Sequence, residues 1–337
     1  MQLNYKSIAL PFEYPFTISN GRTKTHQPSL VVSLSLGNFT GFGEAPAIVY
    51  YDVTVEKMIE DLESKRAMVE KFALTEPARY WHYLHHLFPQ NPFLVSALDM
   101  ACWDLYAKMK GQPLYTLWNT NWENTPVTDY TIGIDTIPKM LEKMKAKPWP
   151  VYKIKLGTPE DIEIMEALTT ATKAVFRVDA NAGWTTEEAL AKIPLLAKMG
   201  VEFIEQPLAK DNWEGMKILY EKSELPLYAD ESCVMESDVQ KCAGYFHGIN
   251  IKLTKCSGPT PALRMIETAR GLGLKVMMGS MNESTIGSAA IAHFLPQLDH
   301  VDMDGPLLLS EDIASGITFD NGLVTLTNKP GLGITLL

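Results

Sequence analysis

The sequence predicts an α/β protein in which an α+β domain precedes a barrel of parallel strands and helices. A change of pattern near residue 125 and eight short apolar stretches after it carry this prediction. The stretches end 22 to 27 residues apart, which leaves room for one strand and one helix in each interval, as in a (β/α)8-type barrel. The predicted strand ends are Gly133, Lys155, Asp179, Glu205, Asp230, Lys252, Gly279 and Asp302.

The N-terminal domain is predicted to span residues 1–125. Two runs, 3-LNYKSIAL-10 and 30-LVVSLSL-36, read as antiparallel strands, and the second turns at Gly37-Asn38 into 39-FTGFGEA-45. Helical spacing of apolar residues follows at about 53–72, 76–88 and 93–110, and the last of these ends at a glycine.

The barrel is predicted to span residues 126–310, and residues 311–337 follow it. The stretch 317-ITFDNGLVTLTNKPGLGI-334 contains a hairpin signal with its turn at Asn321-Gly322. Since a barrel of eight strands has no place for a hairpin, we expect this tail to return to the N-terminal domain and to complete its sheet.

Composition excludes several classes of protein. The net charge of −10 argues against nucleic acid or an anionic membrane as a partner, because both need clustered Lys and Arg. No run of the sequence approaches the length of a membrane span, and the N-terminus lacks a secretory signal, so we expect a cytoplasmic protein. The four cysteines are far apart and lack CxxC spacing, so they are read as reduced packing residues.

Three carboxylates stand at the ends of three consecutive predicted strands. Asp179 lies in 178-VDAN-181, Glu205 in 204-IEQP-207 and Asp230 in 229-ADES-232. In such barrels the carboxyl ends of the strands form the active site, so these side chains should converge. Converging carboxylates repel one another unless a cation lies among them, and an all-oxygen set suits Mg²⁺, one per subunit.

Two lysines are expected on opposite sides of this metal. Lys155 ends the second predicted strand and Lys252 the sixth of an eight-stranded ring. A substrate carboxylate on the metal would then present its α-carbon to a lysine on each face, so that one removes a proton and the other returns one. Lys153, Lys255 and the metal add positive charge, which should lower the pKa of the base toward neutrality, and Lys255 is also expected to bind the substrate.

These residues resemble the enolase superfamily, in its muconate-lactonising subgroup. The resemblance covers nearly the whole chain, from 41-GFGEAP-46 through the lysine and acid series to 330-PGLGI-334. It implies a (β/α)7β barrel with one helix lost or altered, a capping domain built from both chain ends, Mg²⁺, and an enolate formed next to a carboxylate. It further implies that Lys155 and Lys252 are the acid/base pair, that Lys153 steadies the enolate, and that Asp179, Glu205 and Asp230 bind the metal.

The substrate is predicted from Asp302 and Asp304. Two acids two residues apart at a strand end should face the cavity together and bind a cation. This Asp-x-Asp resembles the motif with which dipeptide epimerases hold the α-ammonium group, and 279-GSMNES-284, with Ser280 and Met281, is also similar to theirs. The expected activity is therefore epimerisation of the C-terminal residue in Ala-Xaa dipeptides by a homo-oligomeric enzyme.

Specificity for Xaa should come from the loops 17–29 and 47–52 of the capping domain. One alternative is an acidic side chain paired with Arg22, Lys24 or His26. The other is an apolar side chain in a pocket. The candidates for that pocket are Val49, Tyr50, Tyr51 and Met281.

Other functions stay open on the sequence. Within the same subgroup they are o-succinylbenzoate synthase, N-acylamino acid racemase and muconate cycloisomerase, whose substrates lack a free ammonium group. Outside it, Lys252 could serve as the nucleophile of a Schiff-base aldolase, or the barrel could bind a small ligand without catalysis.

Overall fold

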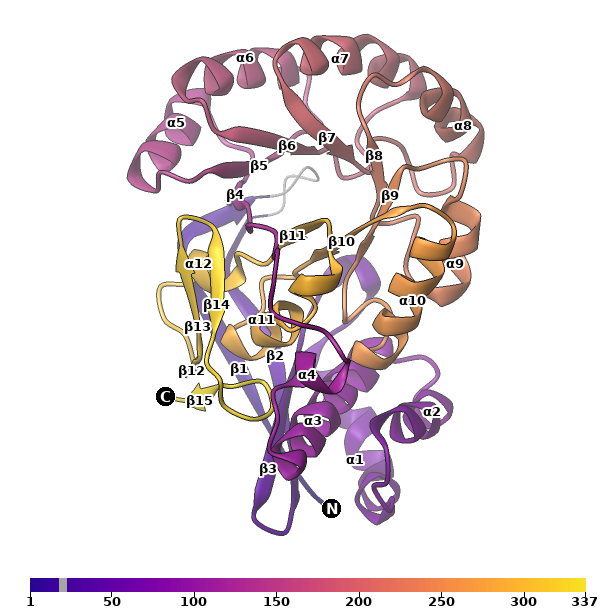
Figure 1. The fold of residues 1–337 in the computed structure, drawn as a ribbon. Helices are drawn as coiled ribbons and strands as arrows, with labels where there is room; N and C mark the ends of the chain where they lie inside the picture. Colours follow the sequence, from indigo (N-terminus) through magenta and orange to yellow (C-terminus); the bar gives the residue numbers. More distant parts are fainter. Residues whose placement is uncertain (18–22) are drawn as a thin grey trace.

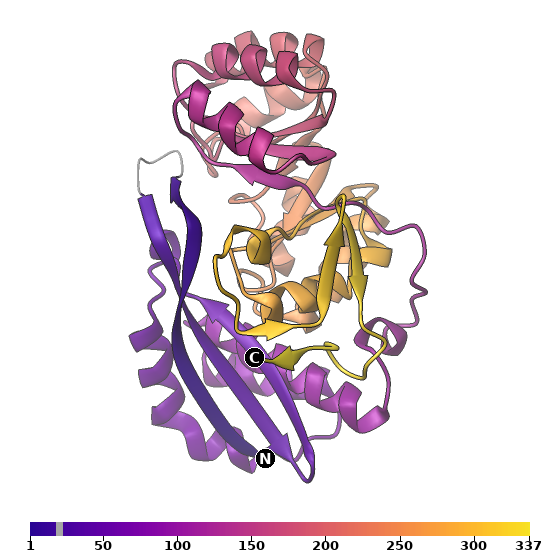
Figure 2. The ribbon, with the colours of Figure 1, turned by 90° about the vertical axis from the view of Figure 1, so that its left-hand side faces the viewer.

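The computed structural model describes residues 1–17 and 23–337 and has two parts (Figure 1). One part is a barrel and the other an α+β domain below it in this view, which we call the cap. Figure 2 shows the long strands of the cap lying side by side with helices on one face. The predicted fold class is confirmed, while the boundaries at residues 125 and 310 stay predictions.

The cap contains one antiparallel sheet in the order β1-β2-β3. Helix α3 packs closely on this sheet. The approach requires glycine at position 43, because a Cβ atom there would lie 1.9 Å from the carbonyl oxygen of Ala97. The predicted helices agree with the observed ones within two residues, whereas β1 and β2 each extend seven residues beyond the predicted strands toward the loop that joins them. The cap elements are β1 (Gln2–Thr17), β2 (Thr23–Leu36), β3 (Phe39–Pro46), η1 (Val49–Tyr51), α1 (Val55–Lys71), α2 (Pro77–Leu87), α3 (Pro92–Lys110) and α4 (Leu114–Leu117).

Eight parallel strands form the barrel, in the sequential order β4 to β11. Their side chains are almost all buried, which explains the apolar runs in the sequence. The strands are β4 (Tyr130–Ile132), β5 (Val151–Lys155), β6 (Val175–Asp179), β7 (Val201–Glu205), β8 (Leu227–Ala229), β9 (Gly248–Ile251), β10 (Lys275–Gly279) and β11 (His300–Asp302).

Helices alternate with these strands and cover the outside of the barrel (Figure 1). The helix that follows β11, α12 (Gly305–Leu308), has four residues. The last full helix of a (β/α)8 barrel is therefore missing, and the fold is (β/α)7β. The connecting helices are α5 (Ile137–Ala146), α6 (Asp161–Ala171), α7 (Thr186–Lys198), α8 (Trp213–Lys222), α9 (Glu236–Cys242), α10 (Pro259–Gly271), α11 (Thr285–Ala292) and η2 (Leu295–Gln297).

The seam between the first and last strands closes through few contacts. A single parallel bridge joins Thr128 to Val301, and the backbone N–H of Met303 donates to Thr128 Oγ1 at 3.0 Å. The carboxylate of Asp304 accepts a hydrogen bond from the backbone N–H of Thr131 at 2.6 Å. Asp304 therefore helps to tie β4 to the end of β11.

The C-terminal tail contains the predicted hairpin but does not complete the cap sheet. Strands β13 (Ile317–Asp320) and β14 (Leu323–Leu326) pair with each other around Asn321-Gly322, and β12 (Ala314–Ser315) pairs with β15 (Thr335–Leu336). The expectation that this hairpin joins β1 to β3 is wrong, because Gly322 packs at Thr128 beside the barrel. The tail contacts the cap through backbone N–H of Leu332, which donates to Asp104 at 2.7 Å.

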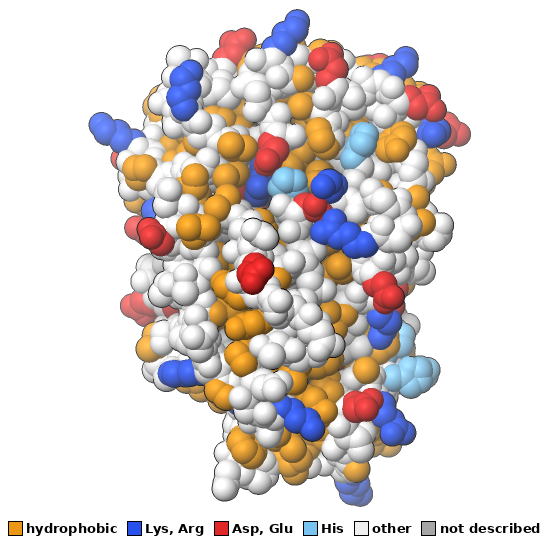
Figure 3. Space-filling view, viewed as in Figure 1, with side chains coloured by type: hydrophobic (Ala, Val, Ile, Leu, Met, Phe, Trp, Pro, Cys, Tyr) orange, Lys and Arg blue, Asp and Glu red, His pale blue; other side chains and the backbone are white. Residues whose placement is uncertain are grey.

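The surface carries mixed charge. On the face drawn in Figure 3, basic and acidic side chains are interspersed rather than separated into large areas of one sign. Among the described residues, no helix is both long enough and apolar enough to span a membrane.

Candidate active site

The three predicted metal ligands meet at the carboxyl ends of β6, β7 and β8. One oxygen each of Asp179, Glu205 and Asp230 lies within 4.8 Å of the others. All three side chains are buried. Strand alternation explains this convergence, because each acid ends or directly follows its strand and faces the inside of the barrel.

Two lysines pair with the outer acids of the triad. Lys155 Nζ lies 2.6 Å from Asp179, and Lys252 Nζ lies 2.9 Å from Asp230. Because β5 and β9 are four strands apart in the eight-stranded ring, these two lysines approach the triad from opposite sides. Between them the three strands β6 to β8 carry the acids.

Lys153 makes the most ion pairs of the site among the described residues. Its ammonium nitrogen lies 2.8 Å from Glu205, 2.8 Å from Asp302 and 3.1 Å from Asp179. The contact with Glu205 Oε2 lies within ion-pair distance but does not have hydrogen-bond geometry. Lys153 therefore compensates negative charge from two sides of the barrel.

Lys255 contacts both the side chain and the backbone of Asp230. Its Nζ pairs with the carboxylate of Asp230, donates to the backbone oxygen of the same residue at 2.6 Å, and donates to that of Cys233 at 3.1 Å. Lys255 also donates to the backbone oxygen of Asn250 on β9 at 3.3 Å, so it ties the loop after β8, with Asp230, to the neighbouring strand. The expectation that it binds substrate stays a prediction.

The electrostatics of the triad are uneven. Burial raises the pKa of Asp179, but the ammonium groups of Lys155 and Lys153 outweigh burial and hold that pKa at about 2. For Asp230, Lys252 and Lys255 likewise outweigh burial and hold the pKa well below its usual range. Burial and the charge of Asp179 raise the pKa of Glu205. The pKa values of the two outer acids are thus lowered and that of the middle acid is raised.

The contact with Asp230 decides the direction in which the pKa of Lys252 is shifted. Burial lowers its pKa, but the charge of Asp230 and its neighbours outweighs burial, and the pKa lies above the usual value. The carboxylate of Asp230, in direct contact with Lys252, thus opposes the cations that surround this lysine.

Two amides that support the triad were missed in the sequence. Asn250 Nδ2 donates to Glu205 at 2.8 Å, and the side-chain oxygen of Gln206 accepts from the backbone N–H of Asp230 at 3.0 Å. Both stand beside a functional residue: Asn250 is two before Lys252 on one strand face, and Gln206 follows Glu205. Strand alternation identifies Asn250, whereas the left-handed φ of 36° at Gln206 is visible only in the structure.

The donor set fits a hard divalent cation. Three carboxylates offer oxygen at the mouth of a barrel, and the nearby buried oxygens Asn181 Oδ1 and Glu231 Oε2 have no hydrogen-bond partner within the described residues. Oxygen ligands without His or Cys are those that Mg²⁺ prefers. Asp179, Glu205 and Asp230 are therefore the residues that could hold it.

Asp302 and Asp304 do not share one environment. Strand β11 ends at Asp302, so the alternation that should place both acids side by side does not extend to Asp304. Asp302 Oδ2 pairs with Lys153, and its Oδ1 is buried without a hydrogen-bond partner among the described residues. Burial opposes ionisation, but Lys153 lowers the pKa of Asp302, whereas burial and Asp302 raise that of Asp304 to about 7.

The predicted specificity residues lie in several different environments. Tyr50 is 55% exposed on η1, and Met281 packs against the apolar core of the cap. Ser280 is buried directly after β10. Lys24 Nζ donates to Gln27 Oε1 at 3.3 Å on β2, and Arg22 lies outside the described residues.

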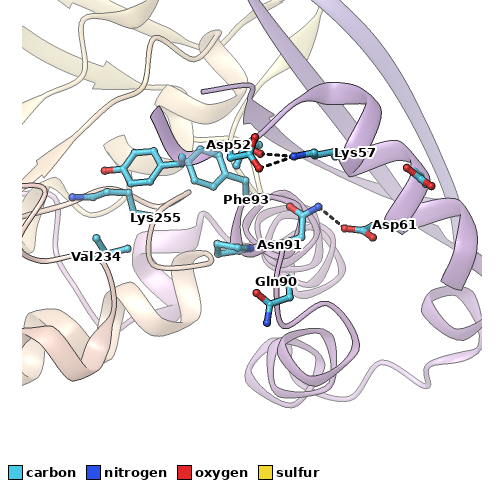
Figure 4. Close-up of a pocket in the computed structure, with 12 residues that line it drawn as sticks. Asp52, Lys57, Asp61, Gln90, Asn91, Phe93, Val234 and Lys255 are labelled. Carbon is cyan, nitrogen blue, oxygen red and sulfur yellow. Dashed lines mark hydrogen bonds and ion pairs between the residues drawn. The ribbon is translucent and has the colours of Figure 1, made fainter. Parts of the chain in front are cut away.

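A pocket of about 460 Å³ lies at the junction of cap and barrel (Figure 4). Tyr51, Asn91 and Phe93 line it from the cap, and Val234 and Lys255 line it from the barrel. Since Lys255 also contacts Asp230, this junction lies beside the acidic triad.

The fold and the site define a capped barrel with acids and lysines gathered at its strand ends. The model of the enolase C-terminal domain-like family matches residues 137–337. The L-Ala-D/L-amino acid epimerase of Flavobacterium johnsoniae is 52% identical over 337 residues, covering 100% of both chains.

Solved structures agree with this match. A substrate-liganded L-Ala-D/L-Glu epimerase from Bacillus subtilis has a TM-score of 0.93 at 29% identity, covering 99% of this chain and 98% of the other. A dipeptide epimerase from Methylococcus capsulatus, in complex with Mg and L-Arg-D-Lys, has a TM-score of 0.90 at 28% identity, with the same coverages of 99% and 98%. The chain belongs to the enolase C-terminal domain-like family, as the resemblance implied, and it is an isomerase of the racemase and epimerase type.

Proposed function

We propose that this enzyme is a Mg²⁺-dependent dipeptide epimerase that inverts the α-carbon of the C-terminal residue of Ala-Xaa dipeptides. One observation carries the proposal: Lys155 and Lys252 approach the triad from opposite sides, each paired with a different outer acid. An inversion needs a proton donor and a proton acceptor on opposite faces of one carbon, and this arrangement supplies them. The names of the relatives support the same substrate class.

In the proposed reaction, one of the two lysines removes the α-proton and the other donates a proton to the opposite face. Mg²⁺ held by Asp179, Glu205 and Asp230 supplies the charge that makes the carbon next to the carboxylate acidic enough. Lys153 adds a fixed positive charge beside the same carboxylate, because burial lowers its pKa but the charges of Asp302 and Glu205 outweigh burial and raise it.

The dipeptide's ammonium group is proposed to bind at Asp302. The free Oδ1 of this residue is a buried acceptor at the end of β11, and Lys153 keeps the carboxylate ionised. A buried carboxylate oxygen without a hydrogen bond is costly, so a charged donor is the partner that the surroundings of Oδ1 favour. Asp304 lies next to it, but its carboxylate already accepts the N–H of Thr131.

The test is exchange of the α-proton in D₂O with Mg²⁺ and a panel of L-Ala-L-Xaa dipeptides, in which Xaa is acidic, basic, apolar or aromatic. We expect deuterium at the C-terminal α-carbon together with the L,D epimer. N-succinyl amino acids, which lack the ammonium group, serve as the matched control. If no dipeptide exchanges, or if Asp302→Asn leaves dipeptide turnover unchanged, the proposed substrate class is wrong.

A further inference from the structure

The segment after Lys252 is held by side chains of the cap. Trp81 Nε1 on α2 donates to the backbone oxygen of Ser257 at 2.9 Å and lies 3.1 Å from its hydroxyl. Trp103 Nε1 on α3 donates to the hydroxyl of Thr260 at 2.9 Å. The cap therefore contacts both the middle and the end of residues 253–260, which we call the lysine loop.

Asp99 is the most deeply buried of these contacts. It lies on α3 with no exposed surface, and its carboxyl group accepts the backbone N–H of Thr260 at 2.8 Å and its hydroxyl at 2.9 Å. The loop passes so close that a Cβ atom at Gly258 would lie 2.5 Å from Asp99 Oδ2. Gly258 also has a φ of 125°, which a side chain would strain.

Backbone hydrogen bonds connect this anchor to the lysine itself. The N–H of Cys256 donates to the carbonyl of Lys252 at 3.1 Å, and that of Gly258 donates to Leu253 at 2.8 Å. One of these hydrogen bonds ends at Lys252 and the other at the residue that follows it. A shift of the loop at Gly258 therefore reaches the backbone of Lys252.

The segment after the opposite lysine is held differently. After Lys155, the backbone N–H groups of Gly157 and Thr158 donate to Asp161 at 3.0 and 2.8 Å. Lys192 donates to the carbonyl of Thr158 at 3.2 Å. These partners all belong to the barrel, so one lysine is positioned by the barrel and the other depends on the cap.

We propose that Asp99 is a positioning residue of the cap that fixes Lys252, and through it only one of the two proton transfers. The inference rests on the proposed function, because it needs the two lysines to act on opposite faces of one carbon. The cap is then part of the scaffold of one catalytic lysine as well as a cover for the substrate.

The experiment compares initial rates of deuterium exchange from the two dipeptide epimers separately, with Mg²⁺ in D₂O. Lys252→Ala first identifies the epimer whose exchange depends on Lys252. The test variants are Asp99→Ala, which removes both acceptors, and Trp81→Phe, which removes one N–H donor and keeps an aromatic ring. Asp99→Asn retains an acceptor for the N–H of Thr260 and is the conservative variant.

Two matched controls separate positioning from stability. Asp104 lies on the same helix and is equally buried, but it accepts the N–H groups of Phe42 and Leu332 instead of the lysine loop. Trp118 has an indole N–H without a hydrogen-bond partner among the described residues. Asp104→Ala and Trp118→Phe therefore disturb packing without releasing residues 253–260.

In Asp99→Ala and Trp81→Phe we expect exchange from the Lys252-dependent epimer to slow about tenfold or more, and exchange from the other epimer to change by less than about twofold. Asp99→Asn should restore most of the rate, and the two controls should leave the ratio of the epimers unchanged. Equal slowing of both epimers, or unchanged rates in folded Trp81→Phe and Asp99→Ala, would overturn the inference. If Asp99→Ala does not fold, Trp81→Phe decides. Wild-type protein that exchanges neither epimer would refute the proposed function as well.

Discussion

The buried carboxyl group of Asp99 should make the stability of the protein depend on pH. Burial raises the pKa of Asp99 from 3.8 to about 8, and the two hydrogen bonds from Thr260 only partly oppose it. The titratable groups that interact with it include Arg264 on α10, Cys102 on α3, Tyr80 on α2 and Cys256. Between these two values the folded protein keeps a proton that the unfolded chain has lost.

The sign follows from proton linkage. A folded pKa above the unfolded one means that stability falls as pH rises, by about 1.4 kcal/mol per pH unit for one proton. Over the full interval from 3.8 to about 8 this amounts to about 6 kcal/mol as an upper bound. Asn is a neutral mimic of the protonated acid, so Asp99→Asn should remove this slope.

The assay is urea-induced unfolding of wild type and Asp99→Asn, followed by tryptophan fluorescence, at about pH 5, 6.5 and 8. We expect the variant to gain stability relative to wild type as pH rises, by about 1.4 kcal/mol per unit. Asp52→Asn is the control, because its side chain is 89% exposed. A constant difference between Asp99→Asn and wild type would refute the reasoning, since it would mean that Asp99 stays ionised throughout.

Three further predictions concern the metal, the lysines and the junction of cap and barrel. Chelation should abolish exchange, and Mg²⁺ at about 100 times its dissociation constant should restore it and stabilise the fold by about 2.7 kcal/mol, measured by unfolding in urea. Lys155→Ala and Lys252→Ala should each lower epimerisation by about 10²- to 10⁴-fold while Mg²⁺ still stabilises the fold; near wild-type turnover in either would contradict the two-base scheme. Glu44→Ala should cost about 1 to 3 kcal/mol for each orphaned donor, because the N–H groups of Ser284 and Gly287 lose their acceptor, and an unchanged urea midpoint would contradict this.

Much of the site follows from position along the chain. Parallel strands at regular spacing place their last residues at one mouth, so Asp179, Glu205, Asp230, Lys155 and Lys252 can be grouped from sequence alone. The contacts of Lys153 were only partly foreseeable, since its pairing with Asp302 joins residues 149 positions apart.

Strand alternation predicts the direction of a side chain only within the strand, so it does not predict the direction of residues that follow the strand end. Asp302 is the last residue of β11 and obeys strand alternation, whereas Asp304 directly precedes α12 and accepts the N–H of Thr131 at the seam. The hairpin at residues 317–326 was predicted from its turn, but its place beside the barrel depends on where Thr128 and Gly322 meet.

The sequence by itself determined the order of elements, the barrel and the chemical series at its strand ends, because these depend on local periodicity and on strand direction. Only the tertiary structure decided which buried groups satisfy one another across the two parts of the molecule. Asp99 and Thr260 are 161 residues apart, and Glu44 and Ser284 are 240 apart. Nothing in local pattern links such pairs; the packing of α3 and β3 against the barrel brings them together, and burial then requires each polar group to find its partner.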